Sequence, residues 1–158
     1  MTTQYWLLKS EPDVYSIDSL KEDGSTGWTG VRNYQARNTM RDGMKEGDLV
    51  LFYHSNAEPP GVAGLAKVQG PCLPDPTQFD KKSDYYDETS SKAEPRWVMA
   101  QVAFVERFAK LVPLEVLKAD PAFEGMALLA RGQRLSVQPV SPAHFARVLK
   151  LAGSKQKK

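Results

Sequence analysis

The sequence predicts an α+β domain in which a small β-barrel or curled mixed sheet is flanked by short helices. The chain has 158 residues, of which 41% are hydrophobic, so its size and composition suit one domain with one core. The apolar runs in the middle of the chain are short and rich in β-branched and aromatic residues, which favours strands. The candidate helices are short and peripheral, and they lack the regular alternation with strands that a parallel doubly wound sheet requires.

In the first part of the chain, predicted strands alternate with short helices. Pro12 ends the first strand because it cannot donate a backbone hydrogen bond, and Gly24 ends the first helix. Met40 and Met44 lie four residues apart, which places them on one face of a second helix. The expected elements are a strand over 5–9, a turn over 10–13, a helix over 16–23, a loop carrying Trp28 and Gly30, a helix over 34–44 and a central strand over 49–53.

The second part of the chain is less regular. Prolines at 71, 74 and 76 open a long excursion, and a loop of that length in a small domain is usually functional or mobile. Ser141 is a good N-cap, and Pro142 suits the first turn of a helix. The expected elements are a strand over 61–68, the excursion over 70–94, a long strand over 96–108, a short helix over 113–118, a strand over 135–140 and a helix over 143–151. We expect one domain over 1–152 and a basic tail over 153–158.

The charge of the chain argues against a broad nucleic-acid-binding face. There are 21 Lys and Arg against 19 Asp and Glu, but three of the lysines lie in the tail. The rest of the chain is nearly neutral, whereas coating duplex DNA needs many phosphate contacts. Any nucleic-acid contact is therefore expected to be local, and the basic segment 31–45 offers a place for it. The segment 80–94 is an acidic counterpart, and a solvated surface is the alternative explanation for both.

Several classes of protein lack their required residues in this sequence. No apolar run approaches the roughly 20 residues of a membrane-spanning helix, and the N-terminus lacks a signal-peptide pattern, so we expect a cytoplasmic protein without membrane contact. The single cysteine, Cys72, permits no internal disulfide. His54, His144 and Cys72 lack the spacing of a zinc site, and neither glycine fingerprint for phosphate binding occurs. We expect no metal and no cofactor.

No catalytic residue is predicted. His54 and Ser55 suggest a hydrolase, but neighbours on a strand point to opposite faces, so this histidine cannot easily serve as the base for this serine. Cys72 has no basic neighbour in the sequence that would activate its thiol. A polar strand end and a packed thiol explain these residues without catalysis.

Trp28 is the most informative aromatic residue. It lies in Gly27-Trp28-Thr29-Gly30, a predicted flexible loop, and the amide- and arginine-rich segment 31–38 follows it. This composition suits a planar heteroaromatic ligand, because an indole stacks on the ring, amides hydrogen-bond to its edge and arginine holds phosphate. The alternative, in which Trp28 folds back as part of the core, stays open.

Five blocks of the sequence, in order along nearly the whole chain, resemble the EVE domain family. They are YWLLKSEP (5–12), WTGVRNYQARN (28–38), FYHSN (52–56), PGVAGL (60–65) and QRLSVQP (133–139). The resemblance implies a PUA-like β-barrel with outer helices, related to the YTH readers of methylated adenine. It also implies a pocket that accepts a modified base in DNA or RNA, and it implies no reaction.

Carried over by position, the resemblance implies which residues form the pocket. Lys9 and Ser10 would lie at its edge, and Trp28 would be a wall of an aromatic cage. The other expected pocket residues are Arg32, Asn33 and Gln35 after Trp28, Tyr53, His54 and Ser55 at the end of the central strand, and Arg134 before the last strand. Arg37 and Arg41 are the expected phosphate contacts. The excursion would form the rim and influence which ligand is chosen.

The sequence therefore predicts a non-catalytic reader of nucleic acid with a modified base. The base is expected to be flipped out or single-stranded, because a stacked base cannot enter a pocket. The sequence identifies no protein partner. Two other functions stay open. ASCH-type domains include hydrolases of modified nucleosides, and Lys9, Ser10 and Glu11 supply suitable groups, although consecutive residues at a strand end diverge in direction. A small-metabolite-binding or protein-interaction module would use the same pocket.

Overall fold

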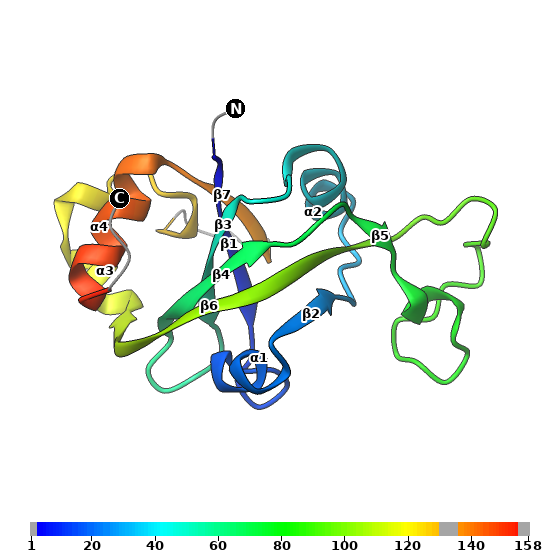
Figure 1. Ribbon diagram of the computed structural model, residues 1–158, viewed down its shortest axis with the longest axis horizontal. Coiled ribbons are helices and arrows are strands. Elements are labelled where there is room, and N and C mark those ends of the chain that lie inside the picture. Colours follow the sequence, from blue (N-terminus) through cyan, green and yellow to red (C-terminus); the bar gives the residue numbers. More distant parts are fainter. Residues whose placement is uncertain (1–2, 130–135, 155–158) are drawn as a thin grey trace.

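The computed structural model describes residues 3–129 and 136–154, which form one curled sheet with helices on both faces (Figure 1). The strands are β1 (Tyr5–Ser10), β2 (Ser25–Trp28), β3 (Leu49–His54), β4 (Gly61–Val68), β5 (Leu73–Pro74), β6 (Val98–Pro113) and β7 (Val137–Val140). The α-helices are α1 (Ile17–Asp23), α2 (Tyr34–Asn38), α3 (Leu114–Ala119) and α4 (Pro142–Ala152). A π-helical turn (Thr39–Gly43) continues α2, and short 3-10 turns occur at Pro76–Phe79, Pro121–Phe123 and Ala127–Leu129.

The sheet is mixed and open. Its seven strands follow the order β2-β6-β4-β3-β1-β7, and the short β5 pairs with β6. β1 and β3 run parallel, and the other pairs in the described part of the chain are antiparallel. Because β2 and β7 lie at opposite ends of this order, the sheet curls without closing. The predicted α+β class is confirmed, and the curled mixed sheet is the form observed.

Alternation along the central strands divides the core into two clusters. Trp6 and Leu8 of β1 belong to the α1-side cluster, which also contains buried residues of α1 and α2. Leu7 belongs to the α4-side cluster, which contains buried residues of α3 and α4. On β3, Phe52 faces the α1 side and Leu51 faces the α4 side. A shift of one position along either strand therefore moves a side chain to the other face of the sheet.

α4 shows how local sequence signals set an element against the sheet. Ser141 Oγ accepts a hydrogen bond from the His144 N–H (3.2 Å), and Pro142 occupies the first turn. Gly153 ends the helix in the left-handed conformation, with φ of 66°. Phe145 is fully buried in the α4-side cluster. The predicted helix is confirmed, and among the described helices none is long and apolar enough to cross a membrane.

β2 is a strand where the sequence predicted a loop. Trp28 pairs opposite Ala100 and Gly27 opposite Gln101, both in β6. A four-residue edge strand that contains a glycine carries too weak an apolar pattern to be recognised, and its pairing depends on β6. β6 itself continues past its expected end to Pro113, whereas Trp97 precedes it rather than lying inside it.

The excursion (residues 70–94) projects from the side of the molecule between β4 and β6 (Figure 1). A buried glutamine holds its two ends together. Gln78 Nε2 donates to the carbonyl oxygens of Asp75 (2.7 Å) and Trp97 (2.8 Å). Gln78 Oε1 accepts from the Trp97 N–H (3.0 Å) and from Ser90 Oγ (2.6 Å). The loop therefore has an ordered base although little of it is regular structure.

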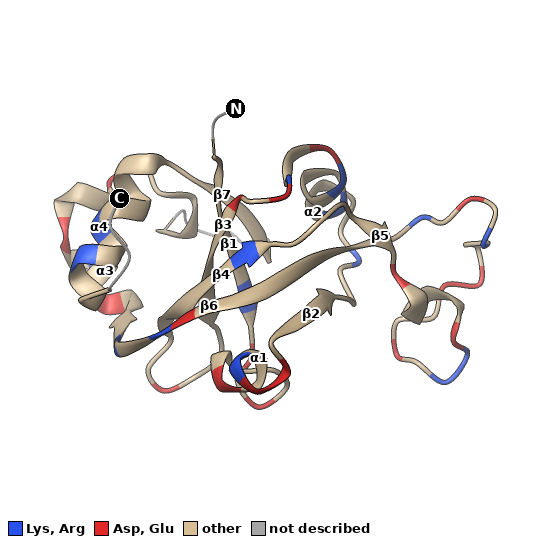
Figure 2. Cartoon of the chain, in the orientation of Figure 1, with Lys and Arg blue, Asp and Glu red and all other residues tan. Residues whose placement is uncertain are grey.

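Charged residues of both signs are interspersed along the fold (Figure 2). The excursion carries both signs, and the exposed Arg41 after α2 pairs with its neighbour Asp42 (2.9 Å). Of the predicted basic tail, residues 155–158 lie outside the described part of the chain. This distribution agrees with the nearly neutral charge predicted for the rest of the protein.

Candidate functional site

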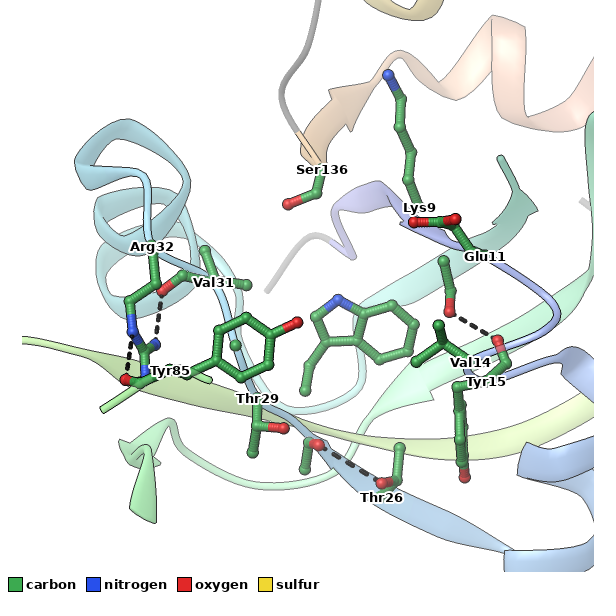
Figure 3. A pocket seen from close by; sticks show the side chains of 14 residues that line it. Lys9, Glu11, Val14, Tyr15, Thr26, Thr29, Val31, Arg32, Tyr85 and Ser136 are labelled. Carbon is green, nitrogen blue, oxygen red and sulfur yellow. Dashed lines mark hydrogen bonds between the residues drawn. The ribbon is translucent and has the colours of Figure 1, made fainter. Parts of the chain in front are cut away.

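A cavity of about 400 Å³ lies where the ends of β1 and β2 meet the start of α2 and the excursion (Figure 3). Sites for small molecules usually have volumes of roughly 300 to 1,000 Å³. Its wall comes from β1 (Lys9, Ser10), the segment 11–15, the segment 26–32, Tyr85 of the excursion and Ser136 before β7. Segments far apart in the sequence thus converge on one space.

Trp28 combines two roles that the sequence left as alternatives. It is the last residue of β2, its side chain is only 8% exposed, and it belongs to the α1-side cluster. Its ring meets Phe52 edge-to-face at a centroid distance of 5.4 Å and Tyr15 at 6.5 Å. Trp28 also lines the cavity. The prediction that it is a loop residue is wrong, because backbone pairing with β6 places it on the sheet.

The indole N–H of Trp28 differs from those of the other two tryptophans. Trp6 Nε1 donates to Asp48 Oδ2 (2.9 Å), and Trp97 Nε1 donates to Asp87 Oδ2 (2.7 Å). Trp28 Nε1 has no hydrogen-bond partner in the described part of the chain, and no side-chain nitrogen or oxygen buried there lacks one. The Trp28 N–H is therefore accessible, and the space it faces is the cavity.

Two hydroxyls, those of Tyr85 and Ser136, also face the cavity without a partner among the described residues (Figure 3). Lys9 lines the cavity as well, but its side chain extends so that the ammonium is directed away from Tyr85. Burial lowers the pKa of Lys9. By contrast, the Ser10 hydroxyl donates to the Tyr15 carbonyl oxygen (2.6 Å). A ligand would therefore meet the indole N–H as a donor and two hydroxyls that either donate or accept.

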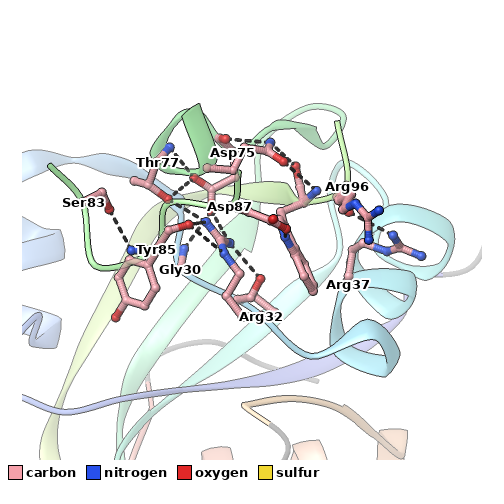
Figure 4. Close-up of polar contacts among 12 residues, drawn as sticks. Gly30, Arg32, Arg37, Asp75, Thr77, Ser83, Tyr85, Asp87 and Arg96 are labelled. Carbon is pink, nitrogen blue, oxygen red and sulfur yellow. Dashed lines mark hydrogen bonds and ion pairs between the residues drawn. The ribbon is translucent and has the colours of Figure 1, made fainter. Parts of the chain in front are cut away.

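Arg32 lines the cavity, but the protein itself occupies its guanidinium (Figure 4). Nε and Nη2 donate to the Tyr85 carbonyl oxygen at 3.1 and 2.7 Å. Nη1 donates to Asp75 Oδ2 (3.1 Å), and Nη2 donates to Thr77 Oγ1 (3.0 Å). Arg32 therefore ties the segment before α2 to the excursion.

Asp75 lies at the other end of this tie, and its side chain is fully buried. Oδ2 also accepts the Gly30 N–H (2.8 Å), while Oδ1 accepts the N–H and the hydroxyl of Thr77 at 2.8 and 2.6 Å. Burial alone would raise the pKa of Asp75, but the hydrogen bonds from Thr77, Gly30 and Arg32 outweigh it and lower the pKa. One carboxylate thus holds both the Gly30 loop and the excursion.

Aromatic rings and guanidinium groups form a stack from α2 to the cavity. The Arg37 guanidinium lies 4.7 Å from the Tyr34 ring centroid, and Tyr34 stacks on Trp97 at 4.9 Å with an interplanar angle of 24°. The Arg32 guanidinium follows, 5.2 Å from the Trp97 ring and 5.5 Å from the Tyr85 ring. Such cation–aromatic contacts stabilise both partners, so Tyr85 at the cavity is linked to α2.

Among the predicted pocket residues, Lys9, Ser10, Trp28 and Arg32 line the cavity. Asn33 does not, because its Oδ1 accepts the Ala36 N–H (3.0 Å) as the N-cap of α2. Gln35 is exposed and lines a separate hollow beside Trp6 and Pro139. Arg134 lies outside the described residues, so its expected approach to the pocket stays a prediction.

The three predicted residues at the end of β3 do not form part of the cavity wall. Tyr53 is buried in the α4-side cluster, because its position on β3 faces away from Phe52. His54 Nε2 accepts the Ile17 N–H (3.1 Å) at the start of α1, and burial lowers the pKa of His54, which favours this neutral acceptor. The Ser55 N–H donates to the Ser10 carbonyl oxygen (2.9 Å). The structure thus places these residues away from the cavity, and their expected role in closing the pocket stays a prediction.

The two predicted phosphate contacts also lie off the cavity wall. Arg37 Nη1 donates to the carbonyl oxygen of Arg96 (2.9 Å), and Arg41 forms the exposed pair with Asp42. Their role with phosphate stays a prediction. Within residues 3–129 and 136–154, no group of three His, Cys, Asp or Glu side chains is arranged to hold a metal ion.

The sequence patterns did not assign Tyr15, Tyr85 or Ser136 to the site. The length of the excursion was the signal that could have directed attention to Tyr85. Ser136 lies within the last of the five sequence blocks, one position from the expected strand end. Tyr15 follows the first strand in a turn, where periodicity gives no direction for a side chain.

Known proteins resemble this chain over almost its whole length. Residues 4–151 match the sequence model of the EVE domain. Thymocyte nuclear protein 1 of Gallus gallus is 41% identical over 174 residues, covering 98% of this chain and 71% of that protein. A solved hypothetical protein from Leishmania major is 46% identical, with a TM-score of 0.91 and 96% of each chain covered. The structure of human THYN1 protein in complex with DNA containing 5-methylcytosine is 40% identical, with a TM-score of 0.89, covering 98% of this chain and 100% of that one.

Proposed function

The chain belongs to the EVE domain family, and from this premise we propose that it binds DNA containing a modified base, 5-methylcytosine, and takes that base into the cavity beside Trp28. Family membership alone names no ligand. The human THYN1 protein has been solved with 5-methylcytosine-containing DNA, and the likeness to it extends over 98% of this chain. That likeness supports DNA with a modified base as the class of ligand.

The observation that carries the proposal is the accessible indole N–H of Trp28 on the wall of a cavity of about 400 Å³. The polar edge of cytosine presents acceptors together with an amino donor. The Trp28 N–H is a donor suited to one of its acceptors, and the hydroxyls of Tyr85 and Ser136 can donate to an acceptor or accept from its amino group. The cavity thus offers hydrogen-bond donors and acceptors of the types that the polar edge of cytosine requires.

A base can enter this cavity only after it leaves its stack. Flipping a base from a duplex costs a few kcal/mol, and an unpaired base costs less. Contact with an aromatic side chain returns about 1 to 3 kcal/mol. The interspersed charges of the protein support only a few phosphate contacts, so we expect weak binding that falls as salt rises (Figure 2).

Selectivity for the methyl group should be modest. One methyl group in an apolar niche contributes about 1 to 3 kcal/mol. The buried Val31, which lines the cavity, offers such a surface.

RNA with a methylated base is a second ligand to be tested in the same assay. The predicted cytoplasmic location also stays a prediction, and the name of the vertebrate relative contains the word nuclear.

We propose binding without a reaction. A hydrolase would need Lys9, Ser10 and Glu11 to act together. However, the Ser10 hydroxyl donates to a backbone carbonyl, and Glu11 Oε1 accepts from Asn56 Nδ2 (2.9 Å). Oligonucleotides incubated with the protein should therefore return with unchanged mass. Loss of an acyl or alkyl group from a modified base, abolished in Lys9→Ala, would instead establish the hydrolase.

The test is a set of titrations with oligonucleotides that are identical except for one 5-methylcytosine. Duplex DNA, single-stranded DNA and RNA are compared by fluorescence anisotropy at fixed salt. We expect tighter binding to the methylated DNA, and we expect Val31→Ala to reduce this preference because it removes the apolar surface offered to the methyl group. Val140→Ala is the matched control, because Val140 is similarly buried and does not line the cavity. Equal affinity of the wild-type protein for methylated and unmethylated strands would refute the proposal.

A further inference from the structure

Tyr85 is the residue of the excursion that reaches the cavity. Its side chain is 46% exposed, and its hydroxyl forms no hydrogen bond to a described residue. Figure 3 shows this hydroxyl directed toward the middle of the cavity. An exposed phenol that faces a cavity can hydrogen-bond to a ligand as a donor or as an acceptor.

The protein fixes the position of Tyr85 although the residue lies in a long loop. Its N–H donates to Ser83 Oγ (3.0 Å), and its carbonyl oxygen accepts two hydrogen bonds from Arg32. Its ring lies against Gly30, where a Cβ atom would come within 2.9 Å of the ring carbons. Gly30 also has a φ of +83°, a conformation that other residues rarely adopt. The ring is therefore preorganised for contact with a ligand.

The geometry of Arg32 suits a positioning role better than a phosphate contact. Each of its three guanidinium nitrogens already donates to the protein, to Val31, Asp75, Thr77 or Tyr85. The guanidinium also lies over the Tyr85 ring. Binding phosphate through Arg32 would require breaking bonds that hold the excursion in place.

We propose that Tyr85 contacts the bound base from the excursion, opposite the sheet, and that Arg32 positions Tyr85 for this contact. The proposal rests on the proposed function, since it names a contact in the same cavity. The Tyr85 hydroxyl bonds to the polar edge of the base, and the adjoining edge of the phenol ring contacts the base.

The test compares two neighbouring tyrosines. Tyr86 is 39% exposed and does not line the cavity, so Tyr86→Ala is matched to Tyr85→Ala. We expect Tyr85→Ala to weaken binding of the methylated oligonucleotide about tenfold, and Tyr86→Ala to leave it nearly unchanged. Tyr85→Phe should lose part of the affinity, because it removes the hydroxyl and keeps the ring. Equal affinities for Tyr85→Ala and Tyr86→Ala would overturn the proposal.

Arg32→Gln separates positioning from phosphate contact. In the wild-type background we expect it to weaken binding, and in the Tyr85→Ala background we expect no further loss. The slope of log affinity against log salt should stay unchanged, whereas losing a phosphate contact would reduce it by about one. A reduced slope, or an equal loss in both backgrounds, would overturn the positioning role of Arg32.

Failure of the Tyr85 proposal can be distinguished from failure of the proposed function. The two alanine variants are compared on whichever oligonucleotide the wild-type protein binds, methylated or not. A wild-type protein without methyl preference would refute the proposed function, while the Tyr85 comparison would still be decided. Absence of binding to any oligonucleotide would overturn both proposals.

Discussion

The two walls of the cavity are held by different interactions. The sheet wall contains Lys9 on β1, which pairs with β3, and Trp28 on β2, which pairs with β6. Trp28 also packs edge-to-face on Phe52 in the core. The excursion wall contains Tyr85, which Arg32 and Asp75 hold through side-chain hydrogen bonds. The sheet wall should therefore be lost only when the domain unfolds, whereas the excursion wall can open locally.

The largest expected effect is that of Trp28→Ala. Truncating a buried tryptophan leaves a cavity, so the free energy of unfolding should fall by about 3 to 5 kcal/mol. Trp97→Ala is the control, since Trp97 is 6% exposed against 8% for Trp28 but belongs to neither core cluster. Urea denaturation should give a smaller loss for Trp97→Ala. Equal losses of unfolding free energy in the two variants would contradict the view that the sheet wall is held by the core more strongly than the excursion wall.

Asp75→Ala should act on the excursion wall. It leaves Arg32 without its buried partner, which typically costs about 3 kcal/mol. Hydrogen exchange should accelerate at amides of residues 76–94, while amides of β1 and β3 stay protected. Asp80→Ala, at an exposed position of the same loop, should leave exchange elsewhere in the loop nearly unchanged. If exchange in β1 and β3 accelerates equally in Asp75→Ala, the excursion does not open on its own.

Acid should weaken the start of α1 and the excursion wall in different pH ranges. The folded pKa of His54 is lowered, so its contribution to stability is complete above its unfolded pKa of about 6.5 and is lost as pH falls through the folded pKa. Asp75, whose pKa is also lowered, contributes fully above its ordinary value of 3.8 and loses its contribution at lower pH. His54→Gln should remove the slope near pH 6 and cost about 1 kcal/mol, as expected for a helix cap. An unchanged slope in His54→Gln would contradict the role of His54.

The smallest expected effect is that of Arg41→Ala, because Arg41 belongs to neither wall of the cavity. Its pair with Asp42 is exposed, so we expect no measurable change in melting temperature. If Arg41 contacts phosphate, the salt slope of DNA binding should fall by about one. Arg107→Ala is matched to it, because the Arg107 and Arg41 side chains are 50% and 47% exposed and each pairs with an aspartate. Identical salt slopes for the two variants would exclude Arg41 as a phosphate contact.

The sheet wall could be predicted from sequence more fully than the excursion wall. Short β-prone runs predicted β1 and β3, and the resemblance in blocks 5–12 and 28–38 directed attention to Lys9 and Trp28. The same alternation that separates His54 from Ser55 also turns Tyr53 to the other face of β3. Tyr53 was nevertheless expected in the pocket, because the resemblance gives positions and not directions.

The excursion wall depends on contacts that no local pattern encodes. Arg32 reaches the carbonyl oxygen of Tyr85, 53 positions away in the sequence, and Asp75 reaches the N–H of Gly30, 45 positions away. Neither hydrophobic periodicity nor turn chemistry predicts such a pair. The short edge strand β2 was missed for a related reason, since its pairing partner β6 lies far along the chain.

The unequal surroundings of the three indoles give this protein an internal optical probe. The N–H groups of Trp6 and Trp97 are engaged by carboxylates, whereas that of Trp28 faces the cavity. A nucleobase that enters the cavity should therefore change the emission of Trp28 far more than that of the other two. The difference between the wild-type protein and Trp28→Phe isolates this signal. Stopped-flow recording would then time the arrival of the base without any attached dye.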